Sequence, residues 1–93
     1  MPITNNDFIP AIKLRMGRAA IGLTQQALAD ITGVAKSTIA RIETLESKGR
    51  PETLELLLGE ITSRGVNIID NADVTGFTIE ITQRGIDRFR INC

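Results

Sequence analysis

Residues 36–43, with the sequence KSTIARIE, place three hydrogen-bond donors on one side of a short helical segment. At helical spacing the two isoleucines would be buried, which leaves Lys36, Ser37 and Arg41 on the outer face. Their ammonium, hydroxyl and guanidinium groups can all donate hydrogen bonds, and the segment has no acidic residue before its last position. This face is suited to noncovalent recognition of a partner that carries negative charge and hydrogen-bond acceptors.

Catalytic and metal-binding chemistry finds little support in the sequence. The chain has no histidine, and its one cysteine, Cys93, is the last residue. A glycine-rich phosphate loop and closely paired carboxylates are missing as well. Asp70 and Asp73 flank a turn and are interpreted as turn-forming residues. The sequence therefore predicts no enzyme activity, no cofactor and no metal site.

The charges are unevenly distributed although their sum is zero. Residues 1–50 carry seven basic and four acidic side chains, whereas residues 51–83 carry one basic and six acidic ones. Attraction to a charged partner depends on the charge within about 8–10 Å rather than on the total. The amino-terminal half can therefore attract an anionic partner.

The length and hydrophobicity of the chain indicate a single soluble domain. The chain has 93 residues, of which 42% are hydrophobic, as in ordinary globular proteins. No apolar stretch approaches the about 20 residues that span a bilayer, and the first residues lack a secretory signal pattern. We therefore expect a cytoplasmic protein without membrane contact.

Periodicity predicts four helices followed by a short β-hairpin. The expected helices cover residues 7–20, 25–32, 36–43 and 51–63, with glycines or a proline at several of their ends. After Gly65 the spacing of apolar residues changes from helical to alternating, which predicts strands at 66–70 and 77–82. The alternation of basic and apolar residues in 87–93 suggests a third strand.

The second and third helices are expected to form a tight elbow. Thr24 can cap the first of them, and Gly33 suits the left-handed conformation that ends it. Two helices joined by such a short turn cross steeply and touch near the turn, where Ala29 is small enough for close contact. The apolar residues that would seal the pair against its neighbours are Leu23, Leu28, Val34, Ile39 and Ile42. The free face of residues 36–43 is then slim enough to enter the DNA major groove, which is about 12 Å wide.

The stretch GLTQQALADITGVAKSTIARIE, residues 22–43, resembles the helix-turn-helix of the phage-repressor (Cro-like) family of DNA-binding transcription regulators. The matching positions are Gly22, Leu23, Thr24, Gln25, Leu28, Ala29, Gly33, Thr38, Ile39, Ile42 and Glu43. The resemblance extends from Arg18 to Leu54, about half of the chain. It implies a mainly α fold, in which a lambda-repressor-like domain of four to five helices is followed by the β-hairpin.

The resemblance also implies roles for individual side chains. Gln25 matches the position that holds a DNA phosphate at the start of the second helix. Side chains of the third helix match those that face the bases, and residues of the following loop match contacts to the DNA backbone. The implied DNA-binding residues are Gln25, Lys36, Ser37, Thr38, Arg41, Thr44, Lys48 and Arg50. Arg18 and Glu43 match a buried ion pair that fixes the third helix.

Two positions depart from the family pattern. Ala35 stands where a serine or threonine usually caps the third helix, so this cap should be missing, at a cost of about 1 kcal/mol. Thr32 replaces a residue that is usually apolar.

These observations favour a sequence-specific transcription regulator that binds double-stranded DNA as a homodimer and represses transcription. One recognition helix reads only a few base pairs, whereas two on a two-fold axis read a pseudo-palindrome. Two alternatives remain: an antitoxin that also regulates its own synthesis, and a protein-interaction module that does not bind DNA. A protein partner such as a toxin or an antirepressor is compatible with the transcription regulator and with the antitoxin. When bound to DNA, the protein would be associated with the nucleoid.

The domain organisation predicted is a DNA-binding domain over residues 1–64 and a dimerising hairpin with a tail over residues 65–93. A two-stranded hairpin alone is marginally stable in water, so its apolar face must pack on a helix or on another chain. The residues expected to dimerise are Val66, Ile68, Phe77, Ile79 and Ile81.

Overall fold

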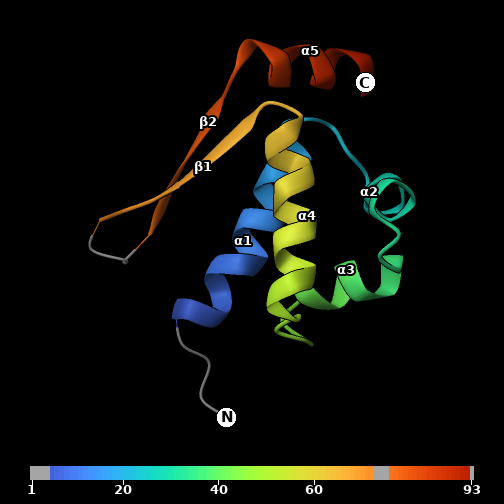
Figure 1. Cartoon of the computed structure of the whole chain (residues 1–93), viewed down its shortest axis with the longest axis vertical. Helices are drawn as coiled ribbons and strands as arrows, with labels where there is room; N and C mark the ends of the chain where they lie inside the picture. The colour runs from blue at the N-terminus through green and yellow to red at the C-terminus, as the bar shows by residue number, and fades with distance from the viewer. Residues whose placement is uncertain (1–4, 73–75, 93) are drawn as a thin grey trace.

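The computed structural model describes residues 5–72 and 76–92, which contain five helices and one two-stranded sheet (Figure 1). In chain order the elements are α1 (Asn5–Ala20), α2 (Gln25–Thr32), α3 (Lys36–Glu43), α4 (Pro51–Ser63), β1 (Val66–Asp70), β2 (Phe77–Ile81) and α5 (Gln83–Asn92). Asp73, interpreted above as a turn former, and Cys93 lie outside the described residues. Within the described part, no helix is long and apolar enough to cross a membrane.

The helices α2, α3 and α4 have the predicted bounds, and α1 begins two residues earlier than predicted. Thr24 precedes α2 in an extended conformation, and its Oγ1 accepts a hydrogen bond from the N–H of Ala27 at 3.0 Å. Gly33 ends α2 with φ 78°, and its N–H donates to the carbonyl of Ala29 at 2.9 Å. Pro51 opens α4, where its fixed φ suits the first turn. Local signals thus set both ends of α2 and the start of α4.

One apolar core joins α1 and α4 to the α2–α3 pair and to the sheet. Its fully buried large side chains are Leu14, Ile21, Leu28, Ile39, Ile42, Leu57, Ile61 and Val66. The helices α1 and α4 approach closely at Gly17, where an added Cβ would lie 2.9 Å from Cγ2 of Ile61. Because α3 contributes two isoleucines to this core, its orientation relative to α1 and α4 is fixed by packing.

The β-hairpin packs its inner face on the helices of its own chain. The strands are antiparallel, with Ile68 opposite Ile79 and Asp70 opposite Phe77, and the two isoleucines pack against the core. Lys13 of α1 closes one edge of this contact. Its Nζ lies 2.6 Å from Oδ1 of Asp70 and 5.5 Å from the centre of the Phe77 ring.

Residues 83–92 form the helix α5, so the third strand predicted over 87–93 is wrong. The physical reason is a local cap. Thr82 donates from its N–H and its Oγ1 to the carbonyl of Gly65, at 3.0 and 2.7 Å, and its Oγ1 accepts from the N–H of Gly85 at 3.3 Å. This geometry starts a helix directly after β2, and the short alternating pattern does not outweigh it.

The helix α5 is held across the end of the molecule by close backbone contacts. Gly65 has φ 106°, and a Cβ added there would collide with the backbone nitrogen of Gly85. A Cβ on Gly85 would in turn lie 2.6 Å from the carbonyl oxygen of Gly65. At the other end of α5, Nδ2 of Asn92 donates to the carbonyl of Ile21 at 2.7 Å. Two glycines and one amide thus dock α5 with few buried side chains.

Candidate nucleic-acid interface

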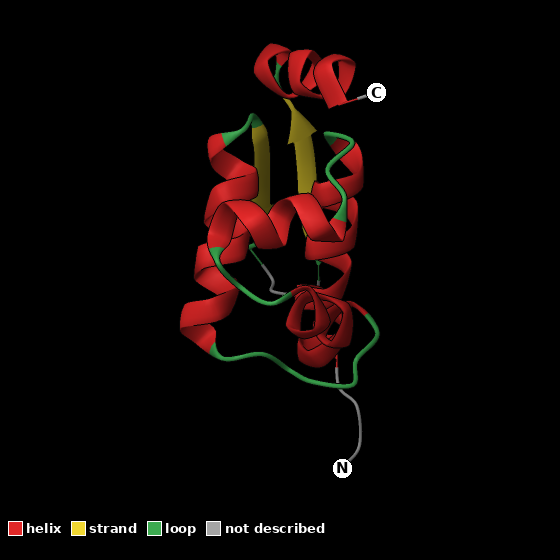
Figure 2. Cartoon of the chain, turned by 90° about the vertical axis from the view of Figure 1, so that its right-hand side faces the viewer, coloured by secondary structure: helices red, strands yellow, loops and turns green. Residues whose placement is uncertain are grey.

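The connection between α2 and α3 is a short elbow held by hydrogen bonds. Gly33 takes the left-handed conformation, and Oγ1 of Thr32 donates to the carbonyl of Leu28 at 2.8 Å. The same hydroxyl accepts a hydrogen bond from the N–H of Val34 at 3.2 Å. The threonine that departs from the family pattern therefore braces the turn. The helices cross steeply, since α2 is seen end-on in Figure 1 and lengthwise in Figure 2, whereas α3 shows the reverse.

The helix α3 has one buried face and one exposed face. Ile39 and Ile42 are 0% and 1% exposed. On the other side Lys36, Ser37 and Arg41 are all exposed. The predicted division of this helix is therefore confirmed, and three donors project from an element whose back is anchored in the core.

Arg41 projects freely enough to reach an external partner. Its side chain is 66% exposed, and its Nε lies 4.0 Å from Oε2 of Glu46, which is itself 67% exposed. An exposed ion pair at this separation contributes little, about 0–1 kcal/mol. Binding a stronger acceptor would therefore displace Glu46 at small cost.

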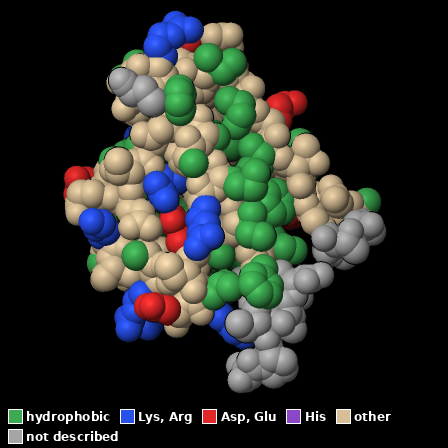
Figure 3. All heavy atoms as spheres, turned by 180° about the vertical axis from the view of Figure 1, so that it is seen from behind, with side chains coloured by type: hydrophobic (Ala, Val, Ile, Leu, Met, Phe, Trp, Pro, Cys, Tyr) green, Lys and Arg blue, Asp and Glu red, His purple; other side chains and the backbone are tan. Residues whose placement is uncertain are grey.

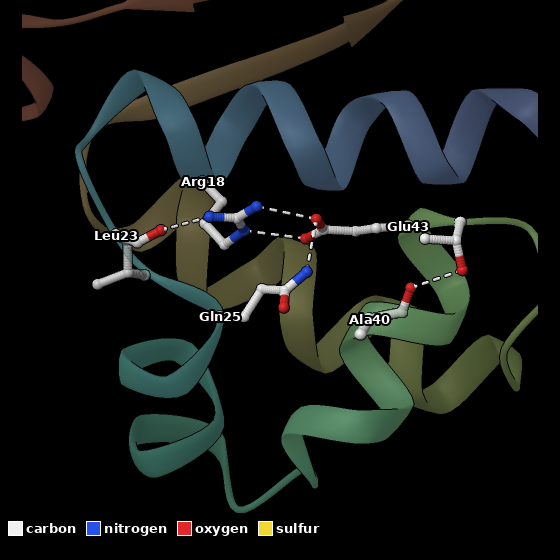
Figure 4. Close-up of polar contacts among 6 residues, drawn as sticks. Arg18, Leu23, Gln25, Ala40 and Glu43 are labelled. Carbon is white, nitrogen blue, oxygen red and sulfur yellow. Dashed lines mark hydrogen bonds and ion pairs between the residues drawn. The ribbon is translucent and has the colours of Figure 1, made fainter.

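Three helices meet at the carboxylate of Glu43, which is 4% exposed (Figure 4). Arg18 of α1 donates to both carboxylate oxygens at 2.9 Å, from Nε and from Nη2. Its Nη1 donates to the carbonyl of Leu23 at 3.0 Å, and Nε2 of Gln25 donates to Oε1 of Glu43 at 3.1 Å. The ion pair implied by the family resemblance is present, and it ties the end of α3 to α1 and α2.

Both members of this pair remain charged at neutral pH. Burial raises the pKa of Glu43, but hydrogen bonds from Arg18 and Gln25, together with the positive charge of Arg18, outweigh burial and hold that pKa below its ordinary value. The hydrogen bond to Glu43 raises the pKa of Arg18, against the opposing effect of its burial. The cluster is therefore a satisfied ionic anchor.

Gln25 has a partner that the sequence reasoning missed. It was expected to face a DNA phosphate, but it is half-buried and one of its amide N–H groups is used by Glu43. The two residues are 18 positions apart, and only the steep crossing of α2 and α3 brings them together. The sequence signal available for this contact was a polar residue at the start of one helix and an acidic residue at the end of the next.

The remaining predicted contacts surround α3. Thr38 is half-buried, and Thr44, Lys48 and Arg50 are exposed at the end of α3 and in the loop that follows it. Oγ1 of Thr44 donates to the carbonyl of Ala40 at 2.9 Å, so this hydroxyl also closes the last turn of α3 (Figure 4). The structure thus groups the candidate residues around one exposed helix and its adjoining loop.

The amino-terminal end of α3 lacks a side-chain cap, as the sequence predicts. Ala35 occupies the cap position and, within the described residues, no side chain accepts a hydrogen bond from the first turn. The N–H groups of Lys36 and Ser37 lie at this exposed end, where helices carry a partial positive charge.

The hairpin residues expected to dimerise are largely used within the chain. Val66 is 0% exposed, so its side chain cannot contact a second copy. Ile68 and Ile79 pack on the core, and Phe77 is half-buried next to Lys13. Ile81 is 37% exposed. The expectation is corrected for Val66, and the inner face of the hairpin is covered by the protein's own helices.

A steep helix pair with a buried ionic anchor and an outward basic helix defines a helix-turn-helix DNA-binding domain. The family model described as Helix-turn-helix, of the Cro/C1 type, matches residues 14–60, about half of the chain. The protein belongs to this family and is a DNA-binding transcription regulator of the Cro/C1 type. Comparisons with curated proteins and with solved structures gave no match.

Proposed function

We propose that the protein is a homodimeric repressor that recognises a specific pseudo-palindromic operator by placing α3 in the major groove. The observation that carries this proposal is the outer face of α3. It presents Lys36, Ser37 and Arg41 to solvent, while two buried isoleucines and the Glu43 cluster hold the helix in one orientation.

The side chains of this face contribute different contacts to DNA, according to their length and chemistry. Arg41 can pair with O6 and N7 of guanine, and Lys36 can reach the same acceptors or a phosphate. Ser37 is short and lets the helix approach the base edges closely. Such contacts supply specificity because the major groove presents a different donor and acceptor pattern for each base pair.

In this proposal the second amide N–H of Gln25 and the start of α2 bind a phosphate, which fixes the position of α3 in the groove. Thr44, Lys48 and Arg50 extend this contact along the DNA backbone. The two cations among them, Lys48 and Arg50, contribute to affinity regardless of sequence, through release of counterions.

Two copies are needed for a specific operator. One α3 reads only a few base pairs, whereas two related by a two-fold axis read half-sites about 34 Å apart. Binding across a promoter would then exclude RNA polymerase.

Selection of bound DNA from a random pool, at two salt concentrations, tests this proposal. The expected result is an inverted repeat with half-site centres about one helical turn apart, and an affinity that falls steeply as salt rises. Arg41→Ala serves as the matched variant, since it should keep the fold and relax one position of the selected sequence. Recovery of random sequences at both salt concentrations would overturn the proposal of sequence-specific binding.

A further inference from the structure

One face of α1 carries apolar side chains that the core does not use. Phe8, Ile12 and Met16 follow one another at intervals of four residues and so lie on the same side of the helix; we name them the α1 ridge. Their exposed fractions are 41%, 40% and 49%. Leu14, which is fully buried, faces the opposite direction. In Figure 3 hydrophobic side chains form a strip along this side of the molecule.

The exposed apolar area matches one half of a protein interface. In Figure 3 the strip runs on toward the end of the molecule that carries α5. On β2 and α5, the exposed apolar side chains include Ile81, Ile86 and Phe89. Together with the ridge, these six side chains are 37–49% exposed. At about 100–200 Å² for a fully exposed side chain of these types, they present about 250–500 Å² of apolar surface. Each partner in a stable complex buries about 800 Å², of which about 450 Å² is apolar.

The order of residues along α1 makes the ridge complementary to itself. If two α1 helices cross antiparallel at Ile12, Phe8 of each copy meets Met16 of the other, and aromatic rings make favourable contacts with thioether sulfur. Arg15 then lies opposite Ile9, so this flank brings no like charges together. Ridges with four-residue spacing interdigitate in the commonest class of helix packing.

We propose that the α1 ridge forms a two-fold interface with a second copy of this chain, with Ile12 at the axis. The inference deepens the proposed function, since it names the surface through which the repressor would dimerise. The α2–α3 pair packs on the core side of α1, away from the ridge. Dimerisation through the ridge therefore leaves the donor face of both α3 helices open to DNA.

The first test is the oligomeric state of the full chain by analytical ultracentrifugation. Ile12→Asp places a charge at the axis and should weaken the dimer by about 30-fold or more, as expected for a residue at the centre of an interface. Ile31→Asp on α2 is the matched control, because Ile31 is the same residue type with the same 40% exposure. It should change the dimer dissociation constant by less than about threefold. A wild-type monomer, or an Ile12→Asp dimer as tight as wild type, would overturn the proposal.

A cysteine at the axis provides an independent test that does not rely on disruption. In a Cys93→Ser background, Ile12→Cys should form a disulfide between the two copies under mild oxidation, because a residue on a two-fold axis faces itself. Ile31→Cys in the same background should cross-link at least about tenfold more slowly. Equal rates for the two variants would overturn the assignment of the axis. Circular dichroism of each variant confirms that the chain is folded before these comparisons.

DNA binding separates the failure of this inference from that of the proposed function. A chain that selects a single half-site as a monomer would refute the ridge interface and leave DNA recognition by α3 standing. A ridge dimer that binds no specific DNA would support the interface and refute the proposed function.

Discussion

The helical region before Gly65 and the hairpin with α5 are held in place by different means. In the first region, buried isoleucines and leucines pack densely, and the carboxylate of Glu43 joins three helices through side-chain hydrogen bonds. In the second, α5 is docked mainly by the close approach of Gly65 and Gly85 and by one amide of Asn92. The family match at residues 14–60 covers most of the first region and ends before the second.

The difference shows that α5 is docked by other contacts than those that orient α3, although the hairpin shares the core of the first region through Val66, Ile68 and Ile79. The orientation of α3 depends mainly on the packing of Ile39 and Ile42 and on the hydrogen bonds of Glu43. The docking of α5 depends on backbone geometry, and is therefore sensitive to single atoms. The following predictions test this contrast, beginning with the largest expected effect.

Gly65→Ala should destabilise the hairpin and α5 more than the helical region before Gly65. The added methyl would meet the Gly85 backbone and occupy φ 106°, so we expect a loss of about 2–4 kcal/mol of stability. Hydrogen exchange should accelerate in α5 and β2 more than in α2 and α3. Gly33→Ala is the matched control, because it also has positive φ, 78°, but no atom lies within 4 Å of its added Cβ. It should cost about 1–2 kcal/mol. Equal losses in the two variants would show that backbone strain alone explains Gly65.

Glu43→Ala should weaken the first region by leaving Arg18 and Gln25 without their shared acceptor. Since the side chains of Glu43 and Arg18 are only 4% and 21% exposed, we expect a loss of about 2–3 kcal/mol of unfolding free energy, measured by urea denaturation. The double variant Arg18→Met with Glu43→Leu should recover most of this loss, because it removes both charges together. A double variant less stable than Glu43→Ala would contradict this account.

Arg41→Ala should affect binding without affecting the fold. The side chain is 66% exposed, so the free energy of unfolding should change by less than about 0.5 kcal/mol. Affinity for a selected operator should fall by about 1–3 kcal/mol, with relaxed preference at one base position. Fluorescence anisotropy with the selected and a scrambled duplex measures both effects. If the variant keeps the wild-type difference in affinity between the two duplexes, Arg41 does not take part in base recognition.

Acid should destabilise the protein through Glu43. Because its pKa is lower in the folded than in the unfolded chain, its charge stabilises the fold above its unfolded pKa, about 4.3, and this contribution is lost as the pH falls through the folded pKa. The urea midpoint should therefore fall below about pH 4.5, and the fall should be weaker for Glu43→Gln. The same slope in both proteins would assign the acid sensitivity to other carboxylates.

The sequence was sufficient to predict the bounds of α2, α3 and α4, because local signals mark α2 and the start of α4 and helical periodicity marks α3. Thr24 and Gly33 define α2, and Pro51 opens α4. The helix α5 was missed because residues 88–91 alternate and the local cap at Thr82 was overlooked. The contact that holds this hydroxyl in place, with the carbonyl of Gly65, spans 17 positions.

The same limit explains what was missed around the candidate site. The outer face of α3 follows from the spacing of Ile39 and Ile42, which are only three positions apart in the sequence. The hydrogen bond between Gln25 and Glu43 depends on the crossing of two helices, and the burial of Val66 depends on how the hairpin folds back. Helical periodicity carries no information on either arrangement.

The carboxylate of Glu43 has a consequence for how DNA is chosen. Any tilt of α3 toward a poorly fitting groove must stretch hydrogen bonds to Arg18 and Gln25 at the same time. In the proposed mode of binding, α3 therefore meets the duplex as a rigid template, and the bending or widening that brings the two together must come from the duplex itself. Operators with easily deformed base steps should be preferred at positions that no side chain touches.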